Sequence, residues 1–413
     1  MNVESRDQIS LKLQAAIYRE SVALVEADIA DSSDIDRVIT NSIGRRWAVG
    51  GPFEIWEQIG WDLVQVIAGE LFGEISVATS APEVSVSEPN ETTGTGSGGN
   101  ANGADSKFQS IAVIGAGLLG HGIALELAIH GKQVFLNDVS EELLVDAVAR
   151  ARVGLAALAS VGRISLDDIE PALLRISTST SLRDSVKNAD LVIEAASENL
   201  ELKKKIFAEI DSSAPDHAVL ASNSSTFVPS AYGSVTNRQS KVVGIHYFNP
   251  PHLLPGIEVI TGPDSSREVV DLVVREFEAI GKKPAVVRTE IQGFISNRLQ
   301  VALLRQAMSI VESGEATSSE VDEIVRSGFG KQLAEFGIFG SLWQSESSNS
   351  HAVLEALFSE LDNGKELPKL LLDKIESGDL GVKTGRGFYD WTPDSAEAWR
   401  KNMAESLLRM GQI

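Results

Sequence analysis

The chain has 413 residues, 43% of them hydrophobic, and a formal net charge of −22 at pH 7. This length predicts more than one domain, and the negative charge argues against nucleic acid as a general partner. The sequence has no Cys, which excludes disulfides, thiolate zinc sites and cysteine nucleophiles, and no metal site is predicted. No apolar run could cross a membrane, and the acidic start lacks signal or transit features, so we expect a cytoplasmic protein without a membrane partner.

Residues 1–75 are predicted to form a helical domain, and part of it recurs near the other end of the chain. Residues 9–53 align with residues 295–339 without a gap, and 16 of the 45 aligned positions are identical. Both segments have the apolar period of a long amphipathic helix followed by a second helix. Residues 33–36 and 319–322 have the Ser-x-x-acid form of a capping box, which predicts a helix start in each copy.

Residues 76–106 are rich in Ser, Gly, Thr and Asn and have no hydrophobic period. Such a composition cannot bury enough apolar surface to offset the entropy lost on ordering. We therefore predict a flexible linker here, between the first helical domain and the rest of the chain.

From residue 107 to about residue 290 the pattern changes to short apolar runs separated by segments with helical periodicity. This alternation predicts a doubly wound, parallel α/β sheet. The runs that we interpret as strands are 111–114, 134–136, 191–193, 242–245, 257–260 and 285–287.

A glycine fingerprint, Gly115-Ala-Gly117-Leu118-Leu119-Gly120, follows the first of these runs and opens an apolar helix. In a dinucleotide site the first Gly permits the tight turn, the second lets the backbone approach a pyrophosphate, and the third lets helix and strand pack closely. We predict that residues 115–120 bind a dinucleotide at the start of the helix. The alternative is a tight strand-to-helix turn with no ligand.

Asp138 ends the next predicted strand, 23 residues after Gly115. An acid at this place can bind the ribose hydroxyls of the adenosine and would repel the 2′-phosphate of NADP, so it favours NAD. The alternative is an Asp that only caps the following helix.

His246 ends the predicted strand 242–245, and Glu258 lies twelve residues later in the next apolar run. Ligands of open α/β sheets bind at the carboxyl ends of strands. A dehydrogenase needs a base for the hydroxyl proton, and a carboxylate can hold an imidazole in one tautomer. We predict that His246 and Glu258 are this base and its partner.

Four motifs in order resemble the 3-hydroxyacyl-CoA dehydrogenase family. They are Ser197-Glu198-Asn-Leu-Glu-Leu-Lys203, Ala221-Ser-Asn-Ser-Ser225, His246-Tyr-Phe-Asn-Pro with Ile-Glu258-Val, and Gly293-Phe-Ile-Ser-Asn297-Arg298-Leu, and residues 383–389 form a family-like ending. The resemblance implies a Rossmann domain that binds NAD at 107–290. It also implies an all-α domain of the 6-phosphogluconate dehydrogenase type at 291–413, which serves dimerisation and substrate binding.

The resemblance also implies roles for single residues. His246 would be the general base with Glu258 as its partner, and Ser225 and Asn297 would hydrogen-bond substrate oxygens. Glu198 and Lys203 would lie near the nicotinamide end of the cofactor. The alternative for Ser225 and Asn297 is a capping role, and for Glu198 and Lys203 a solvated helix start.

The chain departs from the family in its order of domains, because one helical copy precedes the Rossmann domain. This copy has Leu11 where the other has Asn297, but it keeps the Gly-Pro-Phe-Glu turn at residues 51–54 that the family usually has. Residues 337–340 of the second copy read Gly-Ile-Phe-Gly instead. We expect residues 1–75 to dock on 291–413 as an internal partner, and a homodimer stays open.

The expected substrate is a small molecule, and two classes stay open. The commoner activity of the family is NAD-dependent oxidation of an L-3-hydroxyacyl-CoA. However, residues 140–175 contain no Lys to bind CoA, and the chain also resembles the L-gulonate dehydrogenase and lambda-crystallin branch, whose members act on free hydroxy acids. Arg298 is a candidate for binding such a carboxylate, and His252 is expected to line the pocket. A third hypothesis is a catalytically quiet, NAD-binding structural protein.

Overall fold

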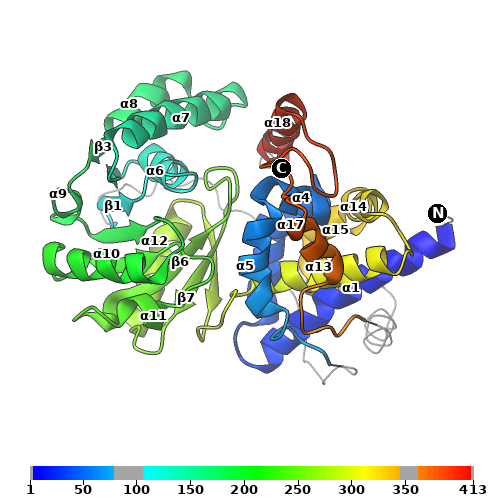
Figure 1. Ribbon diagram of the computed structural model, residues 1–413. Coiled ribbons are helices and arrows are strands. Elements are labelled where there is room, and N and C mark those ends of the chain that lie inside the picture. Colours follow the sequence, from blue (N-terminus) through cyan, green and yellow to red (C-terminus); the bar gives the residue numbers. More distant parts are fainter. Residues whose placement is uncertain (1–2, 79–105, 345–360, 411–413) are drawn as a thin grey trace. The chain divides into compact units, whose positions relative to one another are not determined.

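The computed structural model describes residues 3–78, 106–344 and 361–410 (Figure 1). Nearly all of the predicted linker, and with it the prediction of its flexibility, lies outside the described residues. These residues form two compact units. The helical unit combines residues 3–78 with 293–344 and 361–410, and the sheet unit comprises residues 106–292.

The sheet unit contains one eight-stranded sheet in the order β3-β2-β1-β4-β5-β6-β7-β8. The strands are β1 (Ser110–Ile114), β2 (Gln133–Asn137), β3 (Ile176–Ser179), β4 (Leu191–Glu194), β5 (Val219–Ser222), β6 (Val242–Tyr247), β7 (Gly256–Thr261) and β8 (Lys283–Val287). The order reverses between β1 and β4, as in doubly wound folds that bind ligands at this crevice. The predicted runs all became strands, whereas β3 and β5 were not predicted.

The sheet is mostly parallel, and the prediction of a parallel sheet needs one correction. β7 pairs with β6 in antiparallel fashion and with β8 in parallel fashion. Only residues 248–255 connect β6 with β7, and this is too short for the crossover that two parallel strands require. The chain therefore turns back directly, and His246 and Glu258 become a cross-strand pair.

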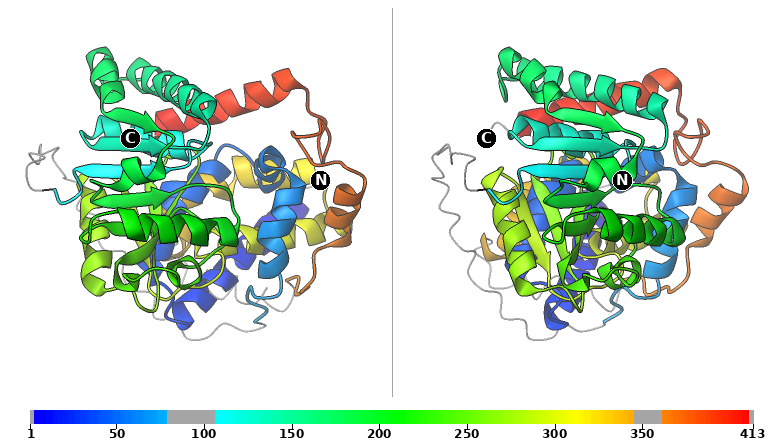
Figure 2. Two further views of the ribbon diagram at one scale, coloured as in Figure 1. Left: turned by 60° about the vertical axis from the view of Figure 1, so that its left-hand side comes forward. Right: turned by 90° about the vertical axis from the view of Figure 1, so that its left-hand side faces the viewer.

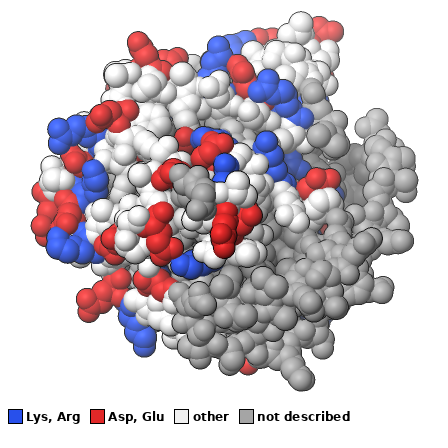
Figure 3. All heavy atoms as spheres, turned by 90° about the vertical axis from the view of Figure 1, so that its right-hand side faces the viewer, with Lys and Arg blue, Asp and Glu red and all other residues white. Residues whose placement is uncertain are grey.

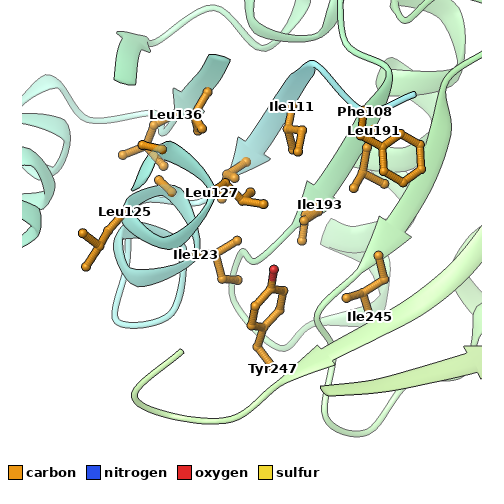
Figure 4. Close-up of a cluster of buried hydrophobic side chains, with 14 of the residues drawn as sticks. Phe108, Ile111, Ile123, Leu125, Leu127, Leu136, Leu191, Ile193, Ile245 and Tyr247 are labelled. Carbon is orange, nitrogen blue, oxygen red and sulfur yellow. The ribbon is translucent and has the colours of Figure 1, made fainter. Parts of the chain in front are cut away.

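Helices cover both faces of the sheet (Figures 1 and 2). One core contains side chains of α6 (Gly120–Ile129), α7 (Glu141–Ser160) and α12 (Arg267–Ala279), and the other contains those of α9 (Leu182–Val186), α10 (Leu200–Ser213) and α11 (Pro229–Gly233). Figure 4 shows the first core, in which Ile123 and Leu127 lie on the side of α6 that faces the strands and Leu125 points away. α8 (Ile169–Leu174) completes the hairpin after α7.

The helical unit contains both copies of the repeat. The first copy comprises α1 (Val3–Glu26), α2 (Ser32–Val38), the π-helix η1 (Ile39–Ile43), α3 (Gly44–Trp47), α4 (Pro52–Ile59) and α5 (Trp61–Leu71). The second comprises α13 (Ser296–Glu312), α14 (Ser318–Ser327) and α15 (Phe329–Gln344), and α17 (Lys369–Glu376) and α18 (Pro393–Met410) follow. The equivalent helices α1 and α13 pack against each other (Figure 1).

The predicted capping boxes at residues 33–36 and 319–322 are wrong by two residues. Asp31 is the N-cap of α2 and accepts from Asp34 N, while Thr317 is the N-cap of α14 and forms a capping box with Glu320. These two caps are equivalent in the repeat. These caps already accept hydrogen bonds from backbone amides of the first turn. The side chains of Asp36 and Asp322, which lie in the second turns of α2 and α14, are therefore available for other contacts.

Asp322 caps a helix of the other copy. Its Oδ1 accepts from Phe53 N at 2.8 Å, and its Oδ2 accepts from Glu54 N at 2.9 Å and from the Tyr389 hydroxyl at 2.7 Å. Both amides belong to the first turn of α4, for which Gly51 is the N-cap. A Cβ atom on Gly51 would lie 2.2 Å from Asp322 Cα, so the two segments are in close contact there. Burial raises the pKa of Asp322 to about 8, although these donors oppose the shift.

The family-like ending at residues 383–389 packs on the first copy. The Glu57 carboxylate accepts from the Trp61 and Trp391 indoles at 2.6 and 2.7 Å and from Phe388 N at 2.5 Å. The Phe388 ring lies 4.8 Å from that of Phe53 and 4.9 Å from that of Trp61. The end of the second copy is thus part of the core around α4 and α5.

Two observations concern the surface of the described residues. No helix among them combines the length and apolar character needed to span a bilayer. On the face drawn in Figure 3, acidic and basic side chains are interspersed and do not gather into a patch of one sign.

Candidate active site

The three glycines of the loop after β1 have different surroundings. Gly115 has a φ of 106°, and Ala195 O would lie 2.6 Å from its Cβ. A Cβ on Gly120 would meet Gly115 O at 1.7 Å, so helix and turn approach as closely as a bare backbone allows. A Cβ on Gly117 would have no atom within 4 Å, which leaves its backbone open to a ligand.

The two Leu residues of the loop differ in environment. Leu118 is exposed, whereas Leu119 packs against the core and precedes the first turn of α6. A turn of bare backbone at the start of a ten-residue helix suits a pyrophosphate, because the free amides and the helix dipole both attract an anion. The residues present therefore fit a dinucleotide.

Asp138 follows β2 and is half-buried beside this loop. Its Oδ2 accepts from Ala116 N at 2.9 Å and its Oδ1 from Ser140 N at 3.3 Å. Asp138 thus braces the glycine loop, and Ser140, not Asp138, is the N-cap of α7. Its predicted contact with ribose hydroxyls stays a prediction.

Glu194, at the end of β4, is a residue that sequence reasoning missed. It is fully buried, and its carboxylate accepts from Lys203 Nζ at 2.9 and 3.0 Å, from Ser222 Oγ at 2.5 Å and from Ala196 N at 2.7 Å. An acid at the end of an apolar strand next to the crevice was the available signal. Glu194 holds Lys203, which is itself buried, and the turn after β4.

Lys203 also contacts Glu198, with Nζ 3.1 Å from Oε2. The other oxygen of Glu198 accepts from Ser225 N at 3.1 Å, Thr226 N at 3.0 Å and the Thr226 hydroxyl at 2.6 Å. Burial opposes ionisation, but the Lys203 charge and the hydroxyl donors outweigh it and lower the pKa of Glu198. Glu198 and Lys203 are therefore not a solvated helix start, and they fix the turn that carries Ser225.

His246 and Glu258 face each other across β6 and β7. His246 Nδ1 lies 2.6 Å from Glu258 Oε2, and both side chains are buried. Since an ionised carboxylate can only accept, Nδ1 carries the hydrogen and Nε2 presents its lone pair. The structure thus brings together the two residues that the strand pattern placed twelve apart.

Ser225 lies on the other side of the imidazole. Its Oγ is 3.0 Å from His246 Nε2, the nitrogen whose lone pair can accept the hydroxyl hydrogen. Ser225, His246 and Glu258 thus form a continuous chain of hydrogen bonds at the carboxyl ends of β5 and β6. A hydroxyl beside Nε2 marks the place where a substrate oxygen could be held while it loses its proton.

The segment after His246 is held in place by a buried lysine. Lys282 Nζ, which is buried, donates to Pro251 O at 2.7 Å and Leu254 O at 2.9 Å and lies 2.7 Å from Glu126 Oε2. His252 packs between α6 and α7. Its Nδ1 and Nε2 lie 3.4 Å from the points that Cβ atoms on Gly122 and Gly154, respectively, would occupy. Burial, and then nearby positive charges, lower the pKa of His252 to about 4.

Asn297 belongs to the helical unit and lies in the first turn of α13. Its amide donates to Gly293 O at 3.1 Å, and its Oδ1 accepts from Gln300 Nε2 at 3.4 Å. A hydrogen bond between Asn297 and an oxygen of the substrate that His246 would deprotonate stays a prediction. The next residue, Arg298, does not suit the expected role in a carboxylate pocket, because it is buried against Glu20 and Glu74.

Most Arg side chains of the hairpin 140–175 are bonded to other groups of the sheet unit. Arg150 donates to Ala116 O and pairs with Asp146, Arg152 pairs with Glu170, and Arg175 donates to Ala128 O. These guanidinium groups brace the glycine loop, α8 and α6. The hairpin thus offers less positive charge to a polyanionic ligand than its composition implies.

Comparisons with known proteins identify the family of both units. The family model described as "3-hydroxyacyl-CoA dehydrogenase, NAD binding domain" matches residues 110–291, and that described as "3-hydroxyacyl-CoA dehydrogenase, C-terminal domain" matches both 9–96 and 293–391. The second model therefore matches the chain twice, which confirms an extra helical copy before the sheet unit.

Three curated relatives are similar over most of the chain. A 5-formyl-3-hydroxy-2-methylpyridine 4-carboxylate 5-dehydrogenase of Mesorhizobium japonicum is 31% identical, over 74% of this chain and 98% of its own. A probable 3-hydroxybutyryl-CoA dehydrogenase of Bacillus subtilis is 33% identical, over 69% and 98%. A lambda-crystallin homolog of Bos taurus is 30% identical, over 73% and 95%.

Among solved structures, that of the NAD⁺-dependent 5-formyl-3-hydroxy-2-methylpyridine 4-carboxylic acid 5-dehydrogenase has a TM-score of 0.69 and 28% identity. It covers 74% of this chain and 98% of its own.

Proposed function

The chain belongs to the 3-hydroxyacyl-CoA dehydrogenase family, and from this premise we propose that it oxidises the 3-hydroxyl group of an L-3-hydroxyacyl-CoA, with His246 as general base. Family membership makes it an NAD-dependent oxidoreductase that acts on CH–OH groups. The observation that carries the proposal is the chain of hydrogen bonds from Ser225 through His246 to Glu258.

In the proposed reaction His246 Nε2 takes the hydroxyl proton while the O–H bond breaks and the carbonyl forms. The hydride leaves the same carbon with the electron pair of its C–H bond, and NAD, if bound, would supply the acceptor. Glu258 stabilises the imidazolium that results, because a buried charge needs a partner. Ser225 and Asn297 hold the substrate oxygen, and residues 115–120 with Asp138, Glu198 and Lys203 bind and border the dinucleotide.

A second candidate is the same oxidation of a free hydroxy acid. Two observations favour it: the internal bonds of Arg150, Arg152 and Arg175, and the name of the Mesorhizobium relative, which specifies a pyridine carboxylate. A free acid needs one or two cations at the site, whereas a CoA thioester also needs a basic surface for its phosphates.

The first helical copy is proposed to act as an internal partner of the second. The bonds of Asp322 to α4 and of Glu57 to residues 388 and 391 support this role. Homodimer formation stays a prediction that sedimentation velocity can check. A cytoplasmic location also stays a prediction.

The test of the proposed function is NADH oxidation with acetoacetyl-CoA, beside NAD reduction with a panel of free hydroxy acids that includes L-gulonate. We expect His246→Gln to lower kcat by about 10²- to 10⁴-fold, the usual contribution of a general base. His217→Gln is the matched control, because His217 is exposed in the same unit and pairs with Asp190.

Each outcome of this assay assigns the substrate class or rejects the proposal. Activity on the thioester alone, lost in His246→Gln and retained in His217→Gln, supports the CoA enzyme. Activity on a free acid alone supports the second candidate. If neither substrate class gives activity while NADH still binds, both candidate functions are rejected, and the result favours a catalytically quiet NAD-binding protein.

A further inference from the structure

We propose that the first helical copy positions Asn297, because Glu20, Leu71 and Glu74 hold residues 293–298 in one conformation. This inference rests on the proposed function, in which Asn297 binds the substrate oxygen. All the contacts that carry it lie within the helical unit. It gives the extra copy a direct influence on the reaction.

The held segment has an uncommon backbone. Gly293 has a φ of 76°, and Phe294, which is buried, has a φ of 54°. A bulky residue in the left-handed region persists only where its surroundings determine it. The first turn of α13 begins from this backbone, since Asn297 N donates to Gly293 O and Leu299 N donates to Ile295 O, both at 3.1 Å.

Leu71 of the first copy packs directly on Gly293. A Cβ on Gly293 would lie 2.6 Å from Leu71 Cδ1 and 2.8 Å from Cδ2, so the Leu side chain occupies that space. Leu71 is itself buried at the end of α5. The turn that precedes Asn297 is therefore closed on one side by the first copy.

Arg298, the neighbour of Asn297, is held by the same copy. Its Nε donates to Glu20 Oε1 at 2.6 Å, and its Nη2 donates to Glu74 O at 2.8 Å. Glu20 Oε2 accepts from Ser76 N at 2.5 Å, which ties the chain after α5 to the same carboxylate. Arg298 and Glu20 are 5% and 1% exposed, so solvent screens this pair little.

The arrangement works in one direction only. The second copy has Gln306 at the position of Glu20, and its Oε1 accepts from Asp362 N at 2.9 Å. The first copy has Lys12 at the position of Arg298, and Lys12 pairs with the exposed Glu315 at 3.0 Å. Only the first copy therefore supplies a buried acid to the helix start that carries Asn297.

Hydrogen exchange in the full-length protein tests whether Glu20 holds this turn. In Glu20→Gln we expect the amides of Asn297 and Leu299 to exchange at least tenfold faster. Lys12→Gln is the matched control, because it also breaks an ion pair between α1 and the second copy but far along the chain from Asn297. Glu20→Asp, which keeps the charge, is expected to restore most of the protection.

Kinetics test whether the effect passes through Asn297. With the substrate identified above, we expect Glu20→Gln to lower kcat/KM about tenfold while the Kd of NADH is unchanged. In a background of Asn297→Ala the same substitution should cause less than a twofold further loss, because coupled residues are not additive. Lys12→Gln should leave both quantities unchanged.

Three results would overturn the inference. The first is wild-type exchange at Asn297 and Leu299 in Glu20→Gln, and the second is equal loss of protection in Glu20→Gln and Glu20→Asp. The third is a full multiplicative loss in the double variant, which would mean that Glu20 acts by another route. An inactive wild-type protein would reject the proposed function instead, and the exchange rates would still decide whether Glu20 holds the turn.

Discussion

The two helical copies share an ungapped register and differ at the residues that make specific contacts. The first copy breaks its helix after α3 and starts α4 at Pro52, whereas the equivalent residues 337–340 of the second lie inside the continuous helix α15. The second copy has Asn297 and Arg298 where the first has Leu11 and Lys12. The two copies thus share their register, whereas a helix boundary and the specific contacts differ between them.

The acids of the second turn show what this divergence means. Asp36 and Asp322 are equivalent in the repeat, but only Asp322 caps the start of α4, and Asp36 is partly exposed. A copy that supplies the cap and a copy that supplies the capped turn are complementary rather than identical.

Three predictions test this comparison of the two copies. Tryptophan fluorescence can report the unfolding of the helical unit in each case, since all six tryptophans lie in this unit.

The largest effect is expected from Gly51→Ala. The new Cβ would lie 2.2 Å from Asp322 Cα, which is backbone and cannot move aside cheaply. We expect the helical unit to lose about 3 kcal/mol or more of unfolding free energy in urea, a cost typical of severe overpacking.

The control for this substitution is Gly314→Ala in the second copy. Gly314 has a φ of 76° but no atom within 4 Å of its Cβ position, so only backbone strain of about 1 kcal/mol is expected. Equal losses in the two variants would show that α4 and α14 do not pack in solution as they do here.

A smaller effect is expected from Asp322→Ala, which removes the acceptor of two backbone amides and of the Tyr389 hydroxyl. We expect a loss of about 2 kcal/mol, the scale of a helix cap with buried donors left unpaired. Asp36→Ala should change the unfolding free energy by less than about 1 kcal/mol, as usual for partly exposed sites. A larger loss in Asp36→Ala would reverse the assignment of the two copies.

A different kind of effect is a dependence of the unfolding free energy on pH. Burial raises the pKa of Asp322 from 3.8 to about 8, so the folded state keeps a proton that the unfolded chain releases. The stability of the helical unit is therefore complete below pH 4 and falls as the pH rises toward 8, by at most about 1.4 kcal/mol per pH unit. Asp322→Asn should flatten this slope in urea titrations at several pH values.

The sheet unit should show the opposite sign through His252. Its pKa is lowered to about 4, chiefly by burial, so its stabilising effect is present above pH 6.5 and is lost as the pH falls toward 4. A probe in the sheet unit, such as the exchange of β1 amides, separates the two trends. The same sign in both units would contradict the assignment to these two residues.

Much of the site followed from local patterns in the sequence. The end of an apolar strand placed His246, and the position of Glu258 on the next run sufficed to predict its partner, because ligands of such sheets gather at strand ends. The glycine loop was predictable because Gly115 and Gly120 each relieve a close backbone contact and Gly117 leaves the backbone open to a ligand. The resemblance to a family added Ser225 and Asn297, which no periodicity identifies.

The rest depended on contacts that no local pattern encodes. The bonds of Glu194 need the fold that brings β4 and α10 together, whereas the antiparallel pairing of β7 could have been inferred from the short connection before it. Arg298 was a candidate for binding a substrate carboxylate, but its partner is Glu20, which lies 278 residues away and belongs to no local pattern around Arg298. The exact start of α14 was misplaced because Thr317 competes with Ser319 for the role of cap.

The helical unit is assembled from both ends of the chain, and this order bears on its synthesis. When the ribosome has made α1 to α5, the helices that will cover their apolar side chains are still more than 200 residues away. At the usual rate of 5–20 residues per second this is a delay of roughly 10 to 60 s. Throughout this interval Phe53 and Trp61 lack the ring of Phe388, against which both pack in the folded protein.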